Sequence, residues 1–444
     1  MSANIPRSSL KRVVIVGGGF AGLELVNRLK KTNYQVVLID KNNYHEFLSL
    51  IYQVGTAGLE SSSISFPFRK LFHKRKNFFF RLAEVRAINY NTKIIQTSIG
   101  KLEYDYLVLA GGTRTNYFGN ERIEKYSIPM KNMEDALGLR NTLLANFERA
   151  LTCATKQERE ELLNVVIVGG GATGVEVAGA IAEMKRFVFP KDYPDADPND
   201  FKITLIEGSG HLLASMSDKA SANAKKYLTK MGVNIRLSTR LKDYDGDIAN
   251  LDSGEQVATR TLIWVSGVTG ISIKNIDGDR IGRGNRILVN EFNQLEGLKD
   301  VFCIGDLALS LHDPAYANGH PQLAQVAIQQ ARRVAQNLKR LDDGQSLVAF
   351  SYKNYGSMAT VGRNKAVAGL GKVKLGGKLA WAMWLVVHLK SILGVRNKFF
   401  VLIQWVWNYF TYDRSARFIL YPRKSFVVKK QEEYEQMHHQ GEDL

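Results

Sequence analysis

Residues 14–22 read VIVGGGFAG, and residues 166–174 read VIVGGGATG. In both stretches a β-branched run precedes the glycines and a helix-like stretch follows them, which is the context of a dinucleotide-binding turn. A single Gly-x-Gly-x-x-Gly motif arises often by chance, but two copies in this context predict two bound dinucleotides. We therefore expect an α/β chain with two interleaved Rossmann-like domains, typical of a flavin enzyme that also binds a nicotinamide.

The glycines of each motif are expected to have different tasks. One permits the tight turn from strand to helix, the next lets a pyrophosphate approach the helix N-terminus, and the last lets the helix pack closely on the sheet. In that order the two copies supply Gly17 and Gly169, Gly19 and Gly171, and Gly22 and Gly174.

An acidic residue ends the second predicted strand of each unit. Asp40 follows the strand expected over 35–39, where its carboxylate could bind the ribose diol of the adenosine in FAD. Glu207 follows the strand expected over 203–206 and favours NADH, because a 2′-phosphate would meet a like charge. No arginine or lysine occurs in 205–212 to receive such a phosphate.

Three further segments, 104–113, 261–267 and 298–306, each resemble a strand that runs into a glycine turn. The last ends in a Gly-Asp pair, and in flavin enzymes with this layout such an aspartate binds the ribityl chain. The cofactor-binding residues predicted in these three segments are Ala110, Gly111, Gly267, Gly305 and Asp306. Those predicted beside the first glycine motif and Asp40 are Phe20, Ala21 and Lys41.

These motifs suggest a domain organisation for the 444 residues. We expect an FAD-binding domain formed by 1–115 and 290–350, with an NADH-binding domain over 116–289 inserted into it. The remainder, 351–444, would hold a C-terminal amphipathic-helix membrane-association module and a polar tail.

The charge of the chain is concentrated near its C-terminus. The net charge is +17, and residues 351–424 hold 13 lysines and arginines against the single acid Asp413. Since no nucleic-acid-binding module accompanies this charge, a nucleic-acid partner is not expected. The two cysteines, Cys153 and Cys303, imply neither a disulfide framework nor a metal cluster.

Two apolar segments, 379–389 and 399–410, carry four of the five tryptophans and are separated by a break at Gly394. Each is shorter than the roughly 20 residues that span a bilayer. Basic, tryptophan-rich amphipathic helices suit the surface of an anionic membrane, although a buried hairpin or a homodimer interface is the alternative. The residues expected to share a helical face are Trp381, Trp384, Leu385, His388 and Ile392 in the first segment, and Phe399, Leu402, Ile403, Val406 and Phe410 in the second.

Three stretches carry a family resemblance: 43–54 (NYHEFLSLIYQV), 170–176 (GGATGVE) and 324–330 (AQVAIQQ). With the two glycine motifs and the C-terminal segment, the chain resembles the type II, non-proton-pumping NADH:quinone oxidoreductases over nearly all of 10–424. This resemblance implies non-covalent FAD, NADH as the substrate and a membrane quinone as the acceptor. It also implies a quinone channel that opens at the membrane. We expect a peripheral location on the cytoplasmic face of the inner membrane, because Met1 to Lys11 hold neither an apolar signal segment nor a transit-like amphipathic leader.

The resemblance also suggests catalytic residues. Glu176 would face the nicotinamide and serve NADH orientation or a proton path, although a helix-surface charge is the plain alternative. Gln325 would offer its amide to a quinone carbonyl, with Ala324 and Gln329 beside it, although a solvated helix face would also explain the glutamines. His45 and Tyr52 could line the flavin pocket or simply pack a loop.

Other activities of the same superfamily remain to be weighed. Dithiol reductases and sulfide:quinone oxidoreductases need redox cysteines at the flavin, and with only Cys153 and Cys303 we expect neither chemistry. A flavin reductase with another acceptor stays open, as does a flavin- and NADH-binding redox sensor. Quinone turnover would separate these alternatives.

Overall fold

The first glycine motif lies in a parallel five-stranded sheet. The computed structural model describes residues 3–371, 373–414 and 416–420. Strand β1 pairs in parallel with β2 and β9, and its residues Val13, Val14 and Ile15 are fully buried. Both faces of this sheet are covered, which explains the continuous apolar runs in its strands. The strands, in spatial order, are β22 (Val301–Cys303), β9 (Tyr106–Leu109), β1 (Arg12–Val16), β2 (Gln35–Asp40) and β5 (Phe78–Leu82).

Helices cover one face of this sheet and a small sheet covers the other. Helix α1 (Phe20–Arg28) packs against α10 (Ala324–Asp342), and both contribute to one apolar cluster with β1 and β2. The opposite cluster includes residues of the antiparallel sheet β6 (Val85–Asn89), β7 (Ile94–Thr97) and β8 (Gly100–Glu103). Because β22 comes nearly 200 residues after β9, the chain leaves the first sheet and later returns to it, as expected.

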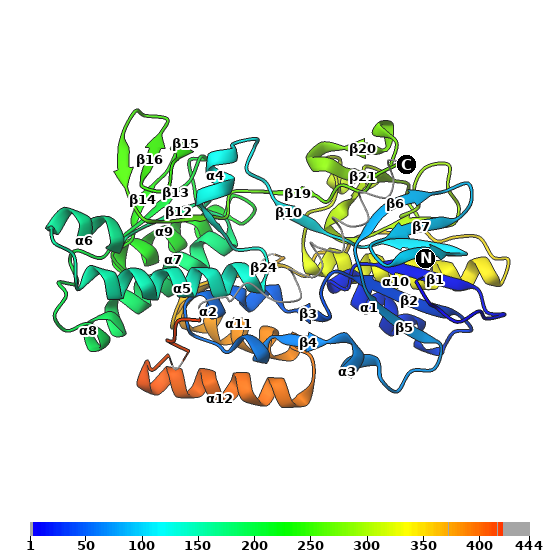
Figure 1. The fold of residues 1–444 in the computed structure, drawn as a ribbon, viewed down its shortest axis with the longest axis horizontal. Helices are drawn as coiled ribbons and strands as arrows, with labels where there is room; N and C mark the ends of the chain where they lie inside the picture. The colour runs from blue at the N-terminus through cyan, green and yellow to red at the C-terminus, as the bar shows by residue number, and fades with distance from the viewer. Residues whose placement is uncertain (1–2, 372, 415, 421–444) are drawn as a thin grey trace, which may run out of the picture.

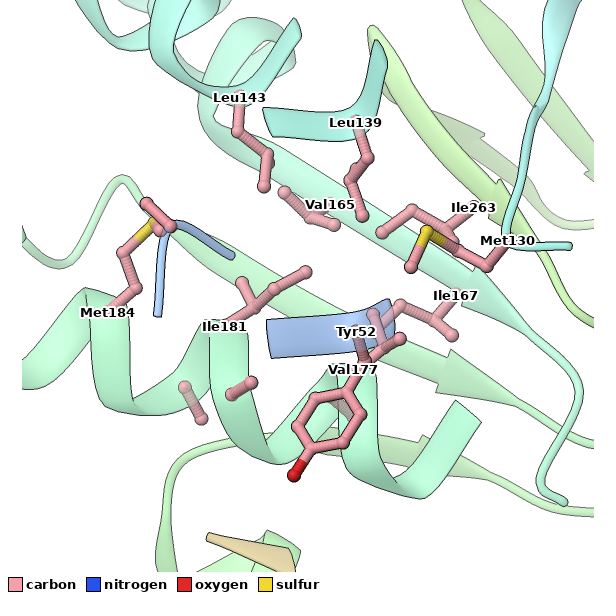
Figure 2. Packing of buried hydrophobic residues seen from close by; sticks show 14 of the residues in the cluster. Tyr52, Met130, Leu139, Leu143, Val165, Ile167, Val177, Ile181, Met184 and Ile263 are labelled. Carbon is pink, nitrogen blue, oxygen red and sulfur yellow. The ribbon is translucent and has the colours of Figure 1, made fainter. Parts of the chain in front are cut away.

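The second glycine motif lies in a second parallel five-stranded sheet. The molecule thus has two lobes, the first built around the sheet of β1 and the second around the sheet of β12, on the left in Figure 1. Its strands, in spatial order, are β11 (Ile128–Pro129), β18 (Thr261–Trp264), β12 (Asn164–Val168), β13 (Lys202–Ile206) and β14 (Asn234–Arg236). Around it lie α5 (Met133–Ala150), α7 (Ala172–Phe187) and α9 (Asp218–Lys230). Figure 2 shows aliphatic residues of α5, α7 and β12 interlocking, while the Tyr52 hydroxyl points away from them.

Two strands join the lobes. Strand β10 (Thr113–Thr115) leaves the first lobe and pairs in antiparallel fashion with the returning strand β19 (Val268–Gly270). Strand β21 (Arg286–Val289) then pairs with β20 (Ile281–Gly282) and β23 (Ala308–Ser310). Strand β21 precedes the predicted boundary at 289/290, and its Ile287 and Val289 pack in the apolar cluster that covers the first sheet.

The C-terminal part begins with an antiparallel sheet and ends with two helices. Strands β24 (Ser357–Gly362), β25 (Lys365–Leu370) and β26 (Val373–Gly376) precede α11 (Gly377–Ser391) and α12 (Val395–Thr411). Gly394 adopts a φ of +73° between the helices, which confirms the predicted break. Among the described residues, no helix is both long and apolar enough to cross a membrane.

The apolar face predicted for α11 points into the protein. Trp384 is only 1% exposed, and Trp381, Leu385 and His388 are half-buried. The assignment of Ile392 to this helical face is wrong, because α11 ends at Ser391 and Ile392 has extended backbone angles. This face of α11 therefore packs against the rest of the protein, which agrees, for this helix, with the alternative of a buried hairpin.

The apolar face predicted for α12 is exposed instead. Phe399 is 58% exposed and Phe410 is 76% exposed, and Val395 at the helix start reaches 85%. Leu402, Ile403, Val406 and Trp407 are exposed as well. The opposite side of α12 packs inward through Val401, which is fully buried. The helix therefore presents an apolar surface with no covering element in the described chain, which argues against a fully buried hairpin.

Shorter elements complete the molecule. Between β2 and β5 lie β3 (Tyr44–Glu46), α2 (Ile51–Gly55), β4 (Ser65–Pro67) and α3 (Phe68–Phe72), which run along the side of the molecule near α12 (Figure 1). The second lobe adds α4 (Glu121–Tyr126), α6 (Lys156–Leu163), α8 (Phe189–Asp192) and the antiparallel strands β15 (Leu241–Tyr244), β16 (Ile248–Leu251) and β17 (Gln256–Ala258).

Candidate functional site

The first glycine turn leaves room for a ligand only where a dinucleotide needs it. Gly17 has a φ of +103°, and a Cβ there would lie 2.4 Å from the Ala110 carbonyl oxygen. A Cβ on Gly22 would lie 1.8 Å from the Gly17 oxygen, so both positions require glycine. Around Gly19, in contrast, a Cβ would meet no atom within 4 Å. This open space at the start of α1, beside Phe20 and Ala21, fits a pyrophosphate bound at a helix N-terminus.

Asp40 lies beside this turn, at the end of β2. Its Oδ2 accepts a hydrogen bond of 2.6 Å from the Gly18 N–H, and its Oδ1 accepts one of 2.7 Å from Asn42. Burial raises the pKa of Asp40, and these two backbone donors oppose that effect. Each oxygen keeps a free lone pair for a ribose hydroxyl. The neighbouring Lys41 is exposed.

His45 is bonded to the backbone of the first glycine turn. Its Nδ1 lies 2.9 Å from the Gly18 carbonyl oxygen, so Nδ1 carries the proton and donates it. Burial lowers the pKa of His45, which keeps the ring neutral. The ring also packs edge-on against Phe20. Of the two roles considered for His45, the packed one is therefore favoured.

The predicted Gly-Asp pair, Gly305 and Asp306, follows β22 in the first lobe. Gly305 has a φ of +76°, and its N–H donates to the Gln330 side chain over 2.7 Å. Burial raises the pKa of Asp306, while the charges of Lys131 and Arg286 lower it. Lys131 donates to the Thr113 hydroxyl over 2.7 Å. Sequence reasoning missed Lys131 and Gln330, because they come from helices and turns far from the motif.

The segment after β9 packs closely against returning chain. A Cβ on Gly111 would lie 2.2 Å from the Ile271 side chain, so glycine keeps this contact tight. Near the second unit, the Gly267 carbonyl accepts a hydrogen bond of 3.1 Å from Asn116. Both predicted glycines thus lie at the crossing between the lobes, where β10 and β19 pair.

The second glycine turn repeats the geometry of the first. A Cβ on Gly169 would lie 2.7 Å from the Val265 oxygen, and one on Gly174 would lie 1.8 Å from the Gly169 oxygen. Around Gly171 a Cβ would again meet no atom within 4 Å. The start of α7 therefore offers a second open helix N-terminus that fits a pyrophosphate.

Glu207 occupies the place that Asp40 has in the first unit. Its Oε2 accepts a hydrogen bond of 2.5 Å from Gly170, and its Oε1 accepts one of 2.7 Å from Ser209. A cation lies closer than the sequence suggested, because the exposed Arg240 side chain packs beside Gly208. Arg240 is distant in sequence and reaches this point only through the fold.

A cavity of about 130 Å³ lies between the second lobe and the C-terminal helices. For comparison, an apolar cavity of about 150 Å³ can hold benzene. It is walled by α2, α7, β24, α11 and α12 and by residues just after α12. Its lining includes Tyr52, Gln53, Thr56, Glu176, Ala180, Glu183, Thr360, Arg363, Trp381, Trp384, Leu385, Trp405, Asn408, Tyr409 and Arg414.

Glu176 projects from the first turns of α7 into this cavity. Its Oε1 accepts a hydrogen bond of 3.4 Å from the Thr360 N–H on β24. Burial raises the pKa of Glu176 to about 8, although the Thr360 N–H acts in the opposite direction. The side chain is therefore mostly protonated at neutral pH. Such a perturbed carboxyl in a cavity marks a functional site more often than a surface charge does.

Polar contacts attach α12 to the opposite wall of the cavity. Trp405 Nε1 donates to Gln53 over 2.9 Å, and Gln53 Nε2 donates to the Tyr52 hydroxyl over 2.8 Å. Asn408 donates to the Gly58 carbonyl over 3.0 Å. These bonds hold α12 against α2 while its other side stays exposed.

Arg414 closes the cavity behind α12. It donates to the Thr56 carbonyl over 2.9 Å and to Glu183 over 3.2 Å. The two side chains are only 12% and 18% exposed, and a largely shielded cation without its partner would be costly, so Arg414 and Glu183 fix the chain after α12 onto α7.

The glutamines of α10 lie outside the lining of this cavity. Gln325 Nε2 donates to the Gly356 carbonyl over 2.9 Å, and its Oε1 accepts from the Tyr355 N–H over 3.1 Å. Gln329 makes the same pair of bonds with Lys353. Both amides, which follow Ala324 in the first turns of α10, thus hold the segment that leads into β24.

The fold and the two glycine turns define a two-dinucleotide oxidoreductase. A family model described as pyridine nucleotide-disulphide oxidoreductase matches residues 11–331, and one described as NDH2 C-terminal domain matches 354–412. The chain is also 34% identical over 411 residues to the type II NADH:quinone oxidoreductase NdhA of Mycobacterium tuberculosis, covering 89% of this chain and 86% of that protein. The chain therefore belongs to the type II NADH:quinone oxidoreductase family.

Two further relatives agree with this assignment. The enzyme Ndh of Mycobacterium tuberculosis, of the same description, is 31% identical over 419 residues, covering 91% of this chain and 89% of that protein. The solved structure of NDH2 from Plasmodium falciparum in complex with NADH shares the fold, with a TM-score of 0.84 at 22% identity. It covers 93% of this chain and 100% of that one.

Proposed function

We propose that this protein oxidises NADH and passes two electrons through FAD to a membrane quinone without pumping protons. The observation that carries the proposal is the cavity lined by Glu176. It joins α7, the helix of the second glycine turn, to α11 and to α12, and α12 carries the exposed apolar surface. A quinone arriving from a membrane would enter between the helices that meet this surface.

FAD would be held without a covalent bond by the first lobe. The open space at Gly19 would take the pyrophosphate, Asp40 the ribose of the adenosine, and Asp306 the ribityl chain. When bound, FAD accepts a hydride from a nicotinamide and passes electrons on two at a time. The protein supports this chemistry by fixing positions and tuning charge.

NADH would be held by the second lobe in the corresponding way. The space at Gly171 would take its pyrophosphate, and Glu207 would bind the ribose of its adenosine. Glu207 also disfavours NADPH, because its charge would meet a 2′-phosphate.

Glu176 would manage protons at the quinone. A quinone that becomes a quinol takes up two electrons and two protons. The hydride of NADH accounts for both electrons and one proton; a protonated Glu176 would give the second proton from its carboxyl group at neutral pH and regain it from solvent. A pKa near the working pH suits a group that both gives and regains a proton. The α10 glutamines would act indirectly, because they position the segment that leads into β24, the strand of Thr360.

The exposed face of α12 would lie on a membrane as a peripheral attachment. Apolar residues from Val395 to Phe410 would enter the boundary between headgroups and acyl chains. We place the protein on the cytoplasmic face of the inner membrane. The same face could instead pair two copies when the protein is away from the membrane.

Anaerobic stopped-flow absorbance tests the proposed reaction. FAD-loaded protein is mixed with NADH and then with a water-soluble quinone. We expect the oxidised-flavin band to bleach with NADH and to recover quickly with quinone. Bleaching that quinone does not reverse would favour the redox sensor or a reductase with another acceptor, and would overturn quinone reduction.

A further inference from the structure

A strongly basic stretch follows α2 and has no part in the sites described above. Residues 61–83 contain six lysines and arginines and no acidic residue. Two of them are half-buried, and they donate to backbone carbonyls: Arg75 to Val26 and Arg81 to Ala3. The other four, on and just after α3, are exposed: Arg69, Lys70, Lys74 and Lys76.

This stretch lies beside the turn between α11 and α12. Asn397, in the first turn of α12, donates to the carbonyls of Ser62 and Ser63 over 3.1 and 3.0 Å. Leu71 of α3 and Leu393 of the turn pack against the same two apolar clusters. In Figure 1, α3 lies next to the end of α12 that receives the chain from α11.

The turn adds cations of its own to this region. Lys390 at the end of α11 and Arg396 at the start of α12 are both exposed. Between them begins the apolar face of α12, with Val395 at 85% exposure. We call Arg69, Lys70, Lys74, Lys76, Lys390 and Arg396 the basic collar.

We propose that the basic collar binds the phosphate headgroups of an anionic membrane, so that the first lobe as well as α12 contacts the lipid. This inference rests on the proposed membrane attachment through α12. Lysines and arginines that surround an inserted apolar face lie at headgroup height, where anionic lipids attract them. Nucleic acid or an acidic protein would explain the charge alone, but not the apolar face that adjoins it.

The collar would also set the orientation of the protein. An inserted apolar face fixes the depth of α12 but leaves the molecule some freedom to rock about the helix axis. A second contact from α3, on the first lobe, removes this freedom. The cavity between α7 and α12 then keeps a constant position relative to the bilayer.

Vesicle sedimentation with three lysine substitutions tests the collar. The FAD-loaded protein is compared with a K70Q/K74Q/K76Q variant and with a K101Q/K242Q/K274Q control, whose three lysines are exposed on strands and loops away from α12. Vesicles contain phosphatidylcholine alone or with about 30% phosphatidylglycerol. Each basic residue near an anionic surface strengthens binding about fivefold, so the first variant should lose about ten- to a hundredfold affinity for anionic vesicles.

The expected results are specific to charge. Binding of the first variant to neutral vesicles should be unchanged, the control should behave as the wild type, and about 0.5 M NaCl should remove the difference. NADH oxidation with a water-soluble quinone should be the same in all three proteins. Equal binding of the variant and the control to anionic vesicles would overturn the collar while leaving attachment by α12 intact. Failure of the wild type to bind any vesicle would overturn both.

Discussion

At the scale of single residues, the two glycine turns separate positions that the fold requires from positions that a ligand requires. At Gly22 and Gly174 a backbone oxygen occupies the space that a Cβ would need, whereas at Gly19 and Gly171 that space is open. Sequence analysis predicted both tasks from spacing alone. In the structure the two tasks can be tested independently. A side chain at Gly22 or Gly174 would disturb the fold, whereas one at Gly19 or Gly171 would disturb only a bound ligand.

Gly171→Ala and Gly174→Ala should therefore fail in different ways. The added methyl group at 171 meets no protein atom, so the G171A variant should unfold at the wild-type temperature and raise KM for NADH about tenfold or more. The methyl group at 174 would press on the Gly169 oxygen, so G174A should lower Tm by several degrees. Thermal melting and steady-state kinetics measure both. A G171A variant with normal KM would show that no pyrophosphate lies there.

Glu207 should control the choice of nucleotide together with Arg240. We expect Glu207→Gln to keep one hydrogen bond at the turn but to remove the charge, leaving Arg240 free to attract a 2′-phosphate. The ratio of kcat/KM for NADH to that for NADPH should fall about tenfold. The double variant E207Q/R240Q should regain part of the preference for NADH. An unchanged ratio in E207Q would contradict the role given to this carboxylate.

Glu176 should influence stability in a direction that depends on pH. Its pKa is raised from 4.5 to about 8 in the folded protein, so the folded state keeps a proton that the unfolded chain releases. The stabilisation from this proton is complete below about pH 4.5 and is lost as the pH rises to about 8. Glu176→Gln lacks this loss. Urea unfolding at pH 5.5 and pH 8.5 should show the variant gaining stability relative to wild type at the higher pH.

The same variant should slow the quinone reaction selectively. A positioned proton donor contributes about a hundredfold or more to a rate, so turnover with quinone should fall by at least tenfold in E176Q. Bleaching of the flavin by NADH should stay close to normal. Equal stability differences at both pH values, together with normal turnover, would leave Glu176 without the proposed role.

At the scale of elements, α11 and α12 divide the work that the sequence assigned to both. Their periodic apolar residues predicted two amphipathic helices, and the break at Gly394 was correctly located. The pattern could not show which face is covered, because an apolar stripe suits a protein core as well as a lipid surface. In the structure α11 buries Trp384 in the core, and α12 leaves Phe399 and Phe410 exposed.

Charges on the exposed face of α12 should release the protein from lipid. We expect the double substitution Phe399→Glu and Val406→Glu to weaken binding to vesicles about ten- to a hundredfold, because apolar surface is no longer buried. Activity with a water-soluble quinone should be retained. Leu151→Glu, on an exposed apolar residue at the end of α5, is the matched control. If the double variant also changes the oligomeric state in solution, the face serves as a contact between copies.

At the scale of the whole molecule, the sequence predicted the sheets well and the cavity hardly at all. Each glycine motif fixes a local strand–turn–helix unit, and two such units imply two parallel sheets. The cavity instead combines residues from Tyr52 to Arg414, brought together from five elements. Tertiary packing alone creates such a site. Nor did the sequence show that the amide of Gln325 bonds to the backbone at Tyr355 and Gly356.

The most direct test of this account is to locate the quinone with a photoreactive analogue and to map the labelled peptides by mass spectrometry. The FAD-loaded protein is bound to vesicles, irradiated, and compared with a sample that contains excess unlabelled quinone. We predict suppressible labelling of peptides from α7, α11 and α12 that line the cavity around Glu176. Suppressible labelling confined to elements outside this cavity would contradict the central claim that the quinone enters there.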